Sequence, residues 1–290
     1  MTPDGVGTAT PCLALDIGGT KAEAAVVTRE GVLLRRDRID VKTAGDQLFE
    51  RIVELLAHVR DDNDVTSLGV ACAGPMINGG VSVSPLNIPV WRDFPLRERL
   101  AAATRLPVAI DGDVRALALA EGKFGAALDV TSYASLVVST GIGGALVMDG
   151  RLVNGDSGNA GHLGHLNVVP NGRRCSCGAL GCLEAEASGW AIEEMTGRSP
   201  QDADESTRRR TATLVGRAMG TLAAVLDFEH CYVAGSVALG YGDEFFTTAT
   251  TAARELATID FARHIQVVKS GLGADGPILG AACVAWRSGL

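Results

Sequence analysis

The stretch "CLALDIGGTKAEAAVV", residues 12–27, decides the fold. An apolar run leads into a glycine pair, and a second apolar run follows the turn. Short apolar runs bounded by turn residues are typical of buried strands, so the pattern predicts two strands joined by a tight turn. The same order returns in "YASLVVSTGIGGALVMDGRLV", residues 133–153. This repetition predicts an α/β protein with two lobes of related design.

Further segments complete the two lobes. Apolar periodicity predicts helices at residues 46–60, 95–106, 114–124, 211–228 and 277–286. Apolar runs predict strands at residues 31–40, 67–76, 107–113, 231–236 and 265–272. We expect a disordered tail at residues 1–10. The N-terminal lobe is expected to comprise residues 11–113 and 276–290, and the C-terminal lobe residues 114–275. The arginine run at 208–210 is interpreted as a solvated helix start.

Composition and charge exclude several classes of protein. The formal net charge is −8, no basic run has a useful length, and aromatic residues make up 4% of the chain. These features argue against a nucleic-acid partner, because such partners need clustered positive charge or aromatic stacking surfaces. No apolar stretch approaches the roughly 18 residues of a membrane helix, and no secretory signal is visible. We therefore expect a cytoplasmic protein whose seven cysteines are reduced.

The glycine turns "DIGGTK", residues 16–21, and "STGIGG", residues 139–144, are candidate phosphate sites. Successive backbone N–H groups in such turns form an anion-binding nest, and the hydroxyls of Thr20, Ser139 and Thr140 add donors. Glycine-rich hairpins are common, and neither turn has a Walker or dinucleotide-binding pattern. Two of them, one per lobe and each at a strand end, nevertheless favour phosphate binding. We expect both turns to face one cleft.

Two carboxylates follow predicted strands. Asp16 ends the first strand, where it could hold hydrated Mg²⁺ against phosphates, although capping of the turn is the simpler alternative. Asp113 stands where the helix after "AIDGD" should begin, so a helix-capping role is open. The functional alternative for Asp113 is a general base that accepts the proton of a sugar hydroxyl during phosphoryl transfer.

The segment "CSCGALGC", residues 175–182, holds three of the seven cysteines. Their spacing is C-x-C-x₄-C, and His165 lies ten positions upstream of the first. Three thiolates and one imidazole form a closed tetrahedral Zn²⁺ set, which predicts a structural metal. Disulfides or inert thiols are the alternative, disfavoured by a reducing compartment and by the interposed glycines. The predicted zinc pins a loop at residues 162–184 that carries His162, His165 and Glu184. The remaining four cysteines are predicted to be core residues: Cys12, Cys72, Cys231 and Cys283.

Taken together, these motifs resemble the sugar kinases of the ROK family, within the two-lobed actin-like (hexokinase/Hsp70-type) ATPase fold. The resemblance runs from about Cys12 to the C-terminus and is carried by "DIGGTK", "GVACAGPM", "DGDVRALALAE", "STGIGGALV", "GNAGHLGH", "CSCGALGCLEAEASG" and "YVAGSV". It implies ATP-dependent phosphorylation of a hexose, usually at the 6-hydroxyl, with ATP, Mg²⁺ and structural Zn²⁺ as cofactors. It also implies a homo-oligomer, since family members are commonly dimers or tetramers.

The resemblance implies a role for each of several residues. Asp113 is the catalytic base, and the metal ligands are His165, Cys175, Cys177 and Cys182. The expected ATP and phosphate contacts are Asp16, Gly18, Gly19, Thr20, Lys21, Thr140, Gly141, Gly143, Gly235 and Ser236. The expected sugar contacts are Asn87, Asp111, Gly112, His162, His165 and Glu184.

Two positions depart from the family pattern. Gly112 stands where the family usually has Asn, and His162 stands where it usually has Glu. Bacterial N-acetylmannosamine kinases are similar in carrying that histidine, but they keep the Asn. We therefore expect an acceptor that differs from glucose around the ring, with an N-acetylmannosamine-like or other amino sugar favoured. Glucose remains an alternative. An aminohexose with a cationic amine, such as kanosamine, is another, because Asp111 is expected to be free to supply a second carboxylate for the ammonium group.

Two functions without catalysis also stay open. A sugar-responsive repressor would carry a helix-turn-helix segment before the first glycine turn, where only about ten polar residues stand. An inactive sugar sensor would be compatible with Gly112. The presence of Asp113, both glycine turns and the cysteine cluster argues against the sensor.

Overall fold

The segment at residues 12–27 forms the predicted pair of strands, β1 (Cys12–Ile17) and β2 (Lys21–Val27), joined by a turn through Gly18 and Gly19. The structure is a computed structural model that describes residues 10–42, 45–77, 79–85 and 87–290. Apart from Thr10, the tail predicted at residues 1–10 therefore lies outside the described residues.

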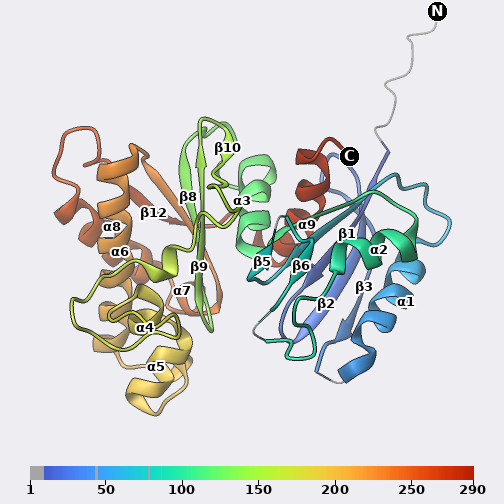
Figure 1. The fold of residues 1–290 in the computed structure, drawn as a ribbon. Coiled ribbons are helices and arrows are strands. Elements are labelled where there is room, and N and C mark those ends of the chain that lie inside the picture. Colours follow the sequence, from blue (N-terminus) through green and yellow to red (C-terminus); the bar gives the residue numbers. More distant parts are fainter. Residues whose placement is uncertain (1–9, 43–44, 78, 86) are drawn as a thin grey trace, which may run out of the picture. The chain divides into compact units, whose positions relative to one another are not determined.

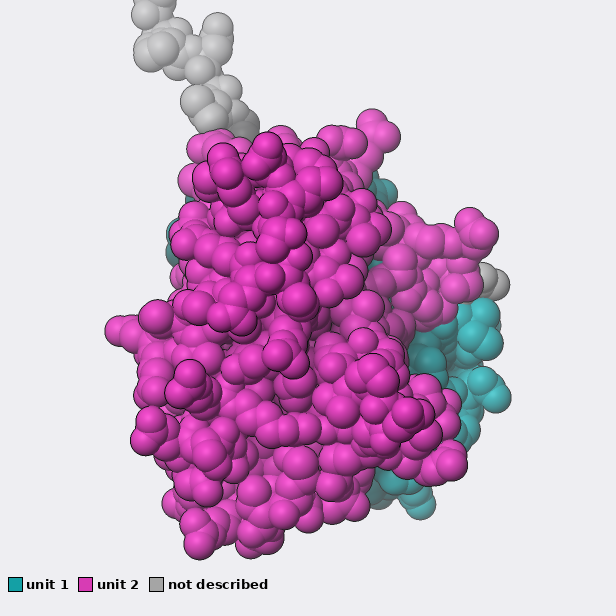
Figure 2. Space-filling model, turned by 90° about the vertical axis from the view of Figure 1, so that its left-hand side faces the viewer, with its two compact units in different colours: residues 1–120, 274–290 teal, residues 121–273 magenta. Residues whose placement is uncertain are grey.

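The chain divides into two compact units, coloured separately in Figure 2. Unit 1 comprises residues 1–120 and 274–290, and unit 2 comprises residues 121–273. The chain passes from unit 1 to unit 2 within helix α3 (Asp113–Phe124). It returns within the short 3₁₀ helix η4 (Gly273–Asp275), just before α9 (Gly276–Arg287).

Unit 1 is built on a five-stranded sheet in the order β3-β2-β1-β4-β7. Figure 1 labels β1, β2 and β3 of this sheet. The pairs β1–β2 and β2–β3 are antiparallel, whereas β4 and β7 run parallel to β1. The remaining elements of this unit are β3 (Leu33–Asp40), η1 (Gly45–Gln47), α1 (Leu48–Arg60), β4 (Leu68–Cys72), β5 (Met76–Ile77), β6 (Ser82–Val83), α2 (Leu96–Thr104) and β7 (Val108–Gly112).

The two faces of the unit 1 sheet bury different side chains. Leu13 and Leu15 of β1 join the hydrophobic cluster that includes the apolar face of α1. Because side chains alternate along a strand, Ala14 and Asp16 point to the opposite face. Helix α9 packs against β1 and β4 on that opposite face. Gly69 of β4 allows its close approach, since a Cβ there would lie 2.0 Å from the carbonyl oxygen of Ala281.

Unit 2 has a sheet of the same design, in the order β10-β9-β8-β11-β12 (Figure 1). Its first three strands are antiparallel and its last two run parallel to β8, as in unit 1, so the predicted repetition is confirmed. Its elements are β8 (Tyr133–Val138), β9 (Ile142–Met148), β10 (Arg151–Leu152), η2 (Leu163–His165), α4 (Leu183–Ala187), α5 (Gly189–Thr196), η3 (Pro200–Asp202), α6 (Glu205–Leu226), β11 (His230–Ala234), α7 (Ser236–Gly240), α8 (Asp243–Leu256) and β12 (Gln266–Lys269).

Helices α6 and α8 pack closely in unit 2. Gly216 makes the contact possible, because a Cβ there would lie 2.1 Å from the carbonyl oxygen of Ala249. The sequence did not predict α8, whose four threonines are β-branched and weak helix formers. The interpretation of residues 208–210 as a solvated helix start is wrong in part. Arg208 donates to the carbonyl oxygens of Gln201 and Ala203, and Arg210 pairs with the buried Glu186.

Within the described residues, no helix combines the length and the apolar character needed to cross a membrane.

Candidate active site and metal centre

The first candidate site lies in unit 1, at the turn between β1 and β2. Asp16 is the last but one residue of β1 and is buried. The N–H of Gly18 donates to the carbonyl oxygen of Lys21 over 2.9 Å, which closes the turn. Asn87 lies against this turn, since a Cβ added at Gly19 would lie 2.6 Å from the Asn87 Cβ. The structure therefore brings together Asp16, the glycine turn and Asn87, which were predicted separately as phosphate and sugar contacts.

Asp16 is in an unusual electrostatic environment. Burial raises its pKa to about 7, and repulsion from Asp113 and Glu23 adds to the effect, whereas Lys21 opposes it. Glu23 of β2 stands opposite Asp16 in the register. Its buried carboxylate is paired with Lys21 at 3.2 Å and with Arg36 at 3.0 Å. Glu23 is thus neutralised by side chains, whereas Asp16 is a buried carboxyl with an incompletely balanced charge.

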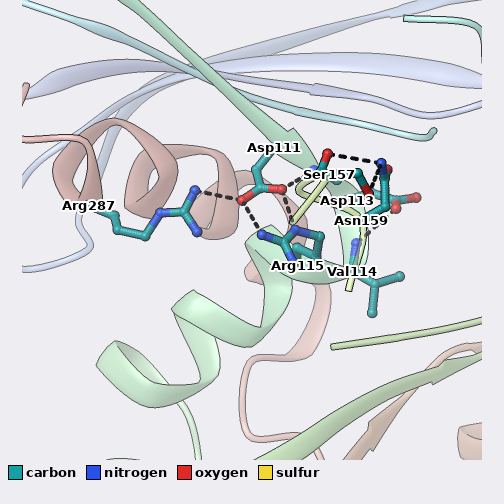
Figure 3. Close-up of polar contacts among 8 residues, drawn as sticks. Asp111, Asp113, Val114, Arg115, Ser157, Asn159 and Arg287 are labelled. Carbon is teal, nitrogen blue, oxygen red and sulfur yellow. Dashed lines mark hydrogen bonds and ion pairs between the residues drawn. The ribbon is translucent and has the colours of Figure 1, made fainter. Parts of the chain in front are cut away.

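Asp113 opens helix α3 at the end of β7. Its carboxylate accepts the N–H of Val114 over 2.8 Å, as Figure 3 shows. This hydrogen bond is local to the first residues of α3. The residue also lies near enough to Asp16 for its charge to raise the pKa of Asp16. Two carboxylates that repel one another form a donor set suited to a divalent cation.

The expectation of a free carboxylate at Asp111 is wrong. One oxygen accepts the N–H of Gly112 at 2.7 Å and the Nε–H of Arg115 at 2.6 Å. The other accepts from the guanidinium of Arg287 at 2.6 Å (Figure 3). A buried carboxylate between two guanidinium groups is already compensated. Asp111 therefore ties the end of β7 to α3 and α9 and has no unpaired charge for a sugar ammonium group.

The second candidate site lies in unit 2, at the turn between β8 and β9. The N–H of Ser139 donates to the carbonyl oxygen of Gly141 over 3.0 Å. The Glu184 carboxylate accepts the N–H of Ile142 over 3.0 Å, and a Cβ at Gly141 would lie 2.8 Å from the same oxygen. Glu184, predicted as a sugar contact, thus holds the glycine turn. Gly143 lies within β9, opposite Val137, and not at the tip of the turn.

A cavity of about 300 Å³ adjoins this turn. This volume is at the lower end of the range for small-molecule sites. Gly235 precedes α7 with a φ of 103°, and a Cβ there would lie 2.3 Å from the carbonyl oxygen of Val138, so only glycine fits. Ser236 follows, with its hydroxyl 3.0 Å from that of Ser139. The cavity is lined by Thr140, Gly189, Trp190, Glu193, Ser199, Pro200, Gln201, Ser236, Val237, Gly240 and Tyr241.

The candidate metal centre of unit 2 consists of the four predicted ligands. The ligand atoms of His165, Cys175, Cys177 and Cys182 all lie within 4.8 Å of one another. The sulfurs of Cys177 and Cys182 are 3.7 Å apart, and the Cys175 sulfur is 3.6 Å from Nδ1 of His165. A Zn–S bond of about 2.3 Å gives a tetrahedron edge of about 3.8 Å, so these separations fit one shared Zn²⁺ ion.

The thiols of this cluster differ in acidity. A backbone hydrogen bond at Ala179 lowers the pKa of Cys177. Burial and the neighbouring Cys177 raise the pKa of Cys182 to about 12. Metal binding would require the deprotonated form of all three cysteines, and a bound cation would balance the three negative charges. His162 lies close by, with its ring centre 6.0 Å from that of His165.

Comparison with known proteins identifies the family. A family model described as "ROK family" matches residues 12–288. The chain belongs to the ROK family. Its relatives include the N-acetylmannosamine kinase of Pasteurella multocida, which is 34% identical and is covered to 95%, with 93% of this chain aligned.

Solved ROK structures share the fold. The ROK hexokinase from Thermus thermophilus superposes with a TM-score of 0.87 at 31% identity, covering 96% of this chain and 99% of the other. A ROK glucokinase from Streptomyces griseus, in complex with glucose and AMPPNP, gives a TM-score of 0.81 at 27% identity, with coverage of 96% and 99%. The family resemblance and the two-lobed α/β fold predicted from the motifs are therefore confirmed.

Sequence reasoning missed several residues at these candidate sites. The cavity in unit 2 takes Trp190 and Glu193 from α5, Gln201 from η3 and Tyr241 from the end of α7. Trp190, which is half-exposed in the structure, follows a glycine in the sequence, and this Gly-Trp pair is a local signal that could have been noted. Arg287, which contacts Asp111, had no such signal.

Proposed function

We propose that this protein transfers the γ-phosphoryl group of ATP to a hydroxyl of a hexose or aminohexose, at the 6-position. The observation that carries this proposal is the matched pair of glycine turns, one beside Asp16 and Asp113 and the other beside the cavity in unit 2. Membership of a family that includes sugar kinases supports it, as does 34% identity to an N-acetylmannosamine kinase.

For the nucleotide, we propose that the unit 2 cavity takes the nucleoside part of ATP. Trp190 and the start of α7 offer apolar surface and backbone N–H groups, and Glu193 and Gln201 offer polar groups. The hydroxyl of Tyr241 is buried without a hydrogen-bond partner among the described residues, so it leaves a polar group for a ligand. Phosphates would be held by Thr140, Gly141, Gly143, Gly235 and Ser236, and in unit 1 by Gly18, Gly19, Thr20 and Lys21.

For the chemistry, we propose that Asp113 accepts the proton of the acceptor hydroxyl as the phosphoryl group is transferred. Asp16 would hold Mg²⁺, since its buried carboxyl lacks a full set of countercharges. Bound Mg²⁺ supplies neutralisation of the phosphate charges. His165, Cys175, Cys177 and Cys182 would hold Zn²⁺, and with four protein ligands this ion has a structural role.

For the acceptor, we propose an N-acetylmannosamine-like amino sugar, contacted by Asn87, Gly112, His162, His165 and Glu184. The identity to the N-acetylmannosamine kinase and the presence of His162 favour it. Glucose is the second candidate, supported by the glucose-bound relative. A cationic aminohexose such as kanosamine is disfavoured, because both oxygens of Asp111 are already paired.

An ADP-release screen tests the proposal. Purified protein with ATP and Mg²⁺ is offered N-acetylmannosamine, mannose, glucose, glucosamine, kanosamine and N-acetylglucosamine, and ADP is measured by a coupled assay. We expect N-acetylmannosamine to give the highest kcat/KM. Sugar-independent ADP release, or none with any sugar in protein that binds ATP, would contradict the kinase assignment. We also propose that the protein forms a homo-oligomer, and light scattering would test this.

A further inference from the structure

Helix α4 is a five-residue helix that follows directly on the metal ligand Cys182. Two of its residues are glutamates whose side chains contact different loops. Glu184 accepts the N–H of Ile142 at the glycine turn of unit 2. Glu186 accepts a backbone N–H from the loop that carries the cysteines. The helix therefore joins the candidate metal centre to the candidate nucleotide turn.

Glu186 is almost completely buried, with 2% of its surface exposed. One oxygen accepts the N–H of Arg173 over 2.6 Å, two residues before Cys175. The other oxygen is paired with the guanidinium of Arg210 on α6 over 2.5 Å. Arg210 also donates to the backbone carbonyl of Glu186 over 2.6 Å. A buried carboxylate with this complete set of partners fixes the backbone that it contacts.

Gly172 brings the metal loop against this carboxylate. A Cβ at Gly172 would lie 2.3 Å from an oxygen of Glu186, so the loop backbone passes directly over the side chain. Arg173 also forms an ion pair with Glu194, which is exposed on α5. Arg173 of this loop thus contacts one buried carboxylate, Glu186, and one exposed carboxylate, Glu194. A variant of Glu194 can therefore serve as the control for a variant of Glu186.

The other end of the connection is the start of α5. The N–H groups of Gly189 and Trp190 donate to the carbonyl oxygens of Ser139 and Thr140, over 2.8 Å and 3.0 Å. Trp190 also lines the cavity. Movement of α4 would therefore displace both the backbone of the glycine turn and one wall of the cavity.

We propose that Glu186 is a positioning residue that couples the metal loop to the nucleotide turn. Zinc bound at the cysteine cluster stabilises the arrangement of α4 that the turn requires, and nucleotide bound at the turn retains the zinc. The coupling is reciprocal, as for any two ligands that favour the same conformation. This inference rests on the zinc and nucleotide assignments proposed above.

The test measures zinc release to a chromogenic chelator, with and without saturating ADP. In the wild-type protein we expect ADP to slow zinc release about 10-fold, within the usual range of coupling between two sites. In Glu186→Gln, which retains an acceptor for Arg173 but loses the charge pair with Arg210, the ADP effect falls to about 2-fold. We expect the matched control Glu194→Gln to behave as wild type.

Arg210→Gln is the second variant. It removes the same ion pair by changing its partner on α6, so the coupling can still be tested if Glu186→Gln folds poorly. Its ADP effect should also fall to about 2-fold. Equal ADP protection in the wild type and both folded variants would overturn the proposal. Wild-type protein without bound zinc would instead refute the zinc assignment itself and the coupling with it.

Discussion

The β1–β2 and β8–β9 hairpins occupy the same place in their sheets but carry different charges. Asp16 pairs with Ala71 of β4, and Val137 pairs in the same way with Ala234 of β11. Across the hairpin, Asp16 stands opposite Glu23, whereas Val137 stands opposite Gly143. The same backbone therefore carries two buried carboxylates in unit 1 and none in unit 2.

The unit 2 turn obtains its carboxylate from outside the hairpin. Glu184 comes from α4, which follows the candidate metal loop. The unit 1 turn instead has Asp16 built into its strand, with Asp113 at the end of β7. On the proposed assignment, the repeated scaffold would separate two tasks, with acid–base and Mg²⁺ chemistry in unit 1 and binding of the nucleoside part of ATP in unit 2.

Replacing the proposed base gives the largest expected effect. Asp113→Asn retains the shape of the side chain and an acceptor for the Val114 N–H, but it cannot take a proton at neutral pH. We expect kcat to fall by roughly 10²–10⁴-fold, the usual contribution of a general base. Zinc content and ADP affinity should stay at wild-type values, because none of the residues proposed to bind zinc or ADP is changed. Turnover close to that of the wild type would remove the base assignment.

Replacing Asp16 tests the charge imbalance in unit 1. Because the folded-state pKa is raised from 3.8 to about 7, ionisation destabilises the folded protein increasingly as pH rises through this interval. Without Mg²⁺, Asp16→Asn should raise the free energy of unfolding above pH 7 by up to about 4 kcal/mol, with little gain near pH 4. Urea unfolding across this range measures the difference.

The control for this experiment is Asp260→Asn, since that carboxylate is 92% exposed. It should leave the pH profile of unfolding unchanged. If Asp16→Asn raises the free energy of unfolding equally at pH 4 and pH 8, the added stability does not come from removing a buried charge at Asp16. Kinase activity should be lost at every pH, so that Asp16 would contribute to function at a cost in stability.

The hairpins and the clustering of the three cysteines could be predicted because their signals are local. Two apolar runs around a glycine pair specify a hairpin, and C-x-C-x₄-C brings three thiols together by chain connectivity. The pairing of Asp111 with Arg287 could not be predicted, since 176 positions separate them. The cavity also draws on separate segments from Thr140 to Tyr241, so it exists only once α5, η3 and α7 have packed together.

Replacing one glycine by alanine in each turn tests how rigidly the neighbours of the two turns are held. In Gly19→Ala the new Cβ meets the Cβ of Asn87 at 2.6 Å, so the neighbouring backbone must move. In Gly141→Ala it meets only the end of the Glu184 side chain at 2.8 Å, which can swing away. We expect Gly19→Ala to cost about 1–3 kcal/mol in unfolding free energy and Gly141→Ala to cost less.

The functional readout should separate the two turns further. Swinging Glu184 away leaves the N–H of Ile142 without its acceptor, so Gly141→Ala should raise the KM for ATP several-fold. Thermal unfolding and ATP titrations of the two variants check both expectations. A larger stability loss in Gly141→Ala than in Gly19→Ala would show that Glu184 is more rigidly held than its contacts suggest.

The smallest expected effect on stability is at Gly112, next to the proposed base Asp113. A Cβ there would be 3.4 Å from the Cδ of Arg115, an ordinary contact, so Gly112→Asn should change the unfolding free energy by only about 0.5 kcal/mol. The added amide would supply the sugar contact that the family resemblance implies at this position. If it forms one hydrogen bond to glucose, the kcat/KM for glucose relative to N-acetylmannosamine should rise roughly 10-fold. Gly112→Ala adds the Cβ without the amide and should leave the ratio unchanged. An equal change of the kcat/KM ratio in both variants would mean that the Cβ alone changes the choice of sugar. No change of the ratio in either variant would show that Gly112 does not contribute to the choice of sugar.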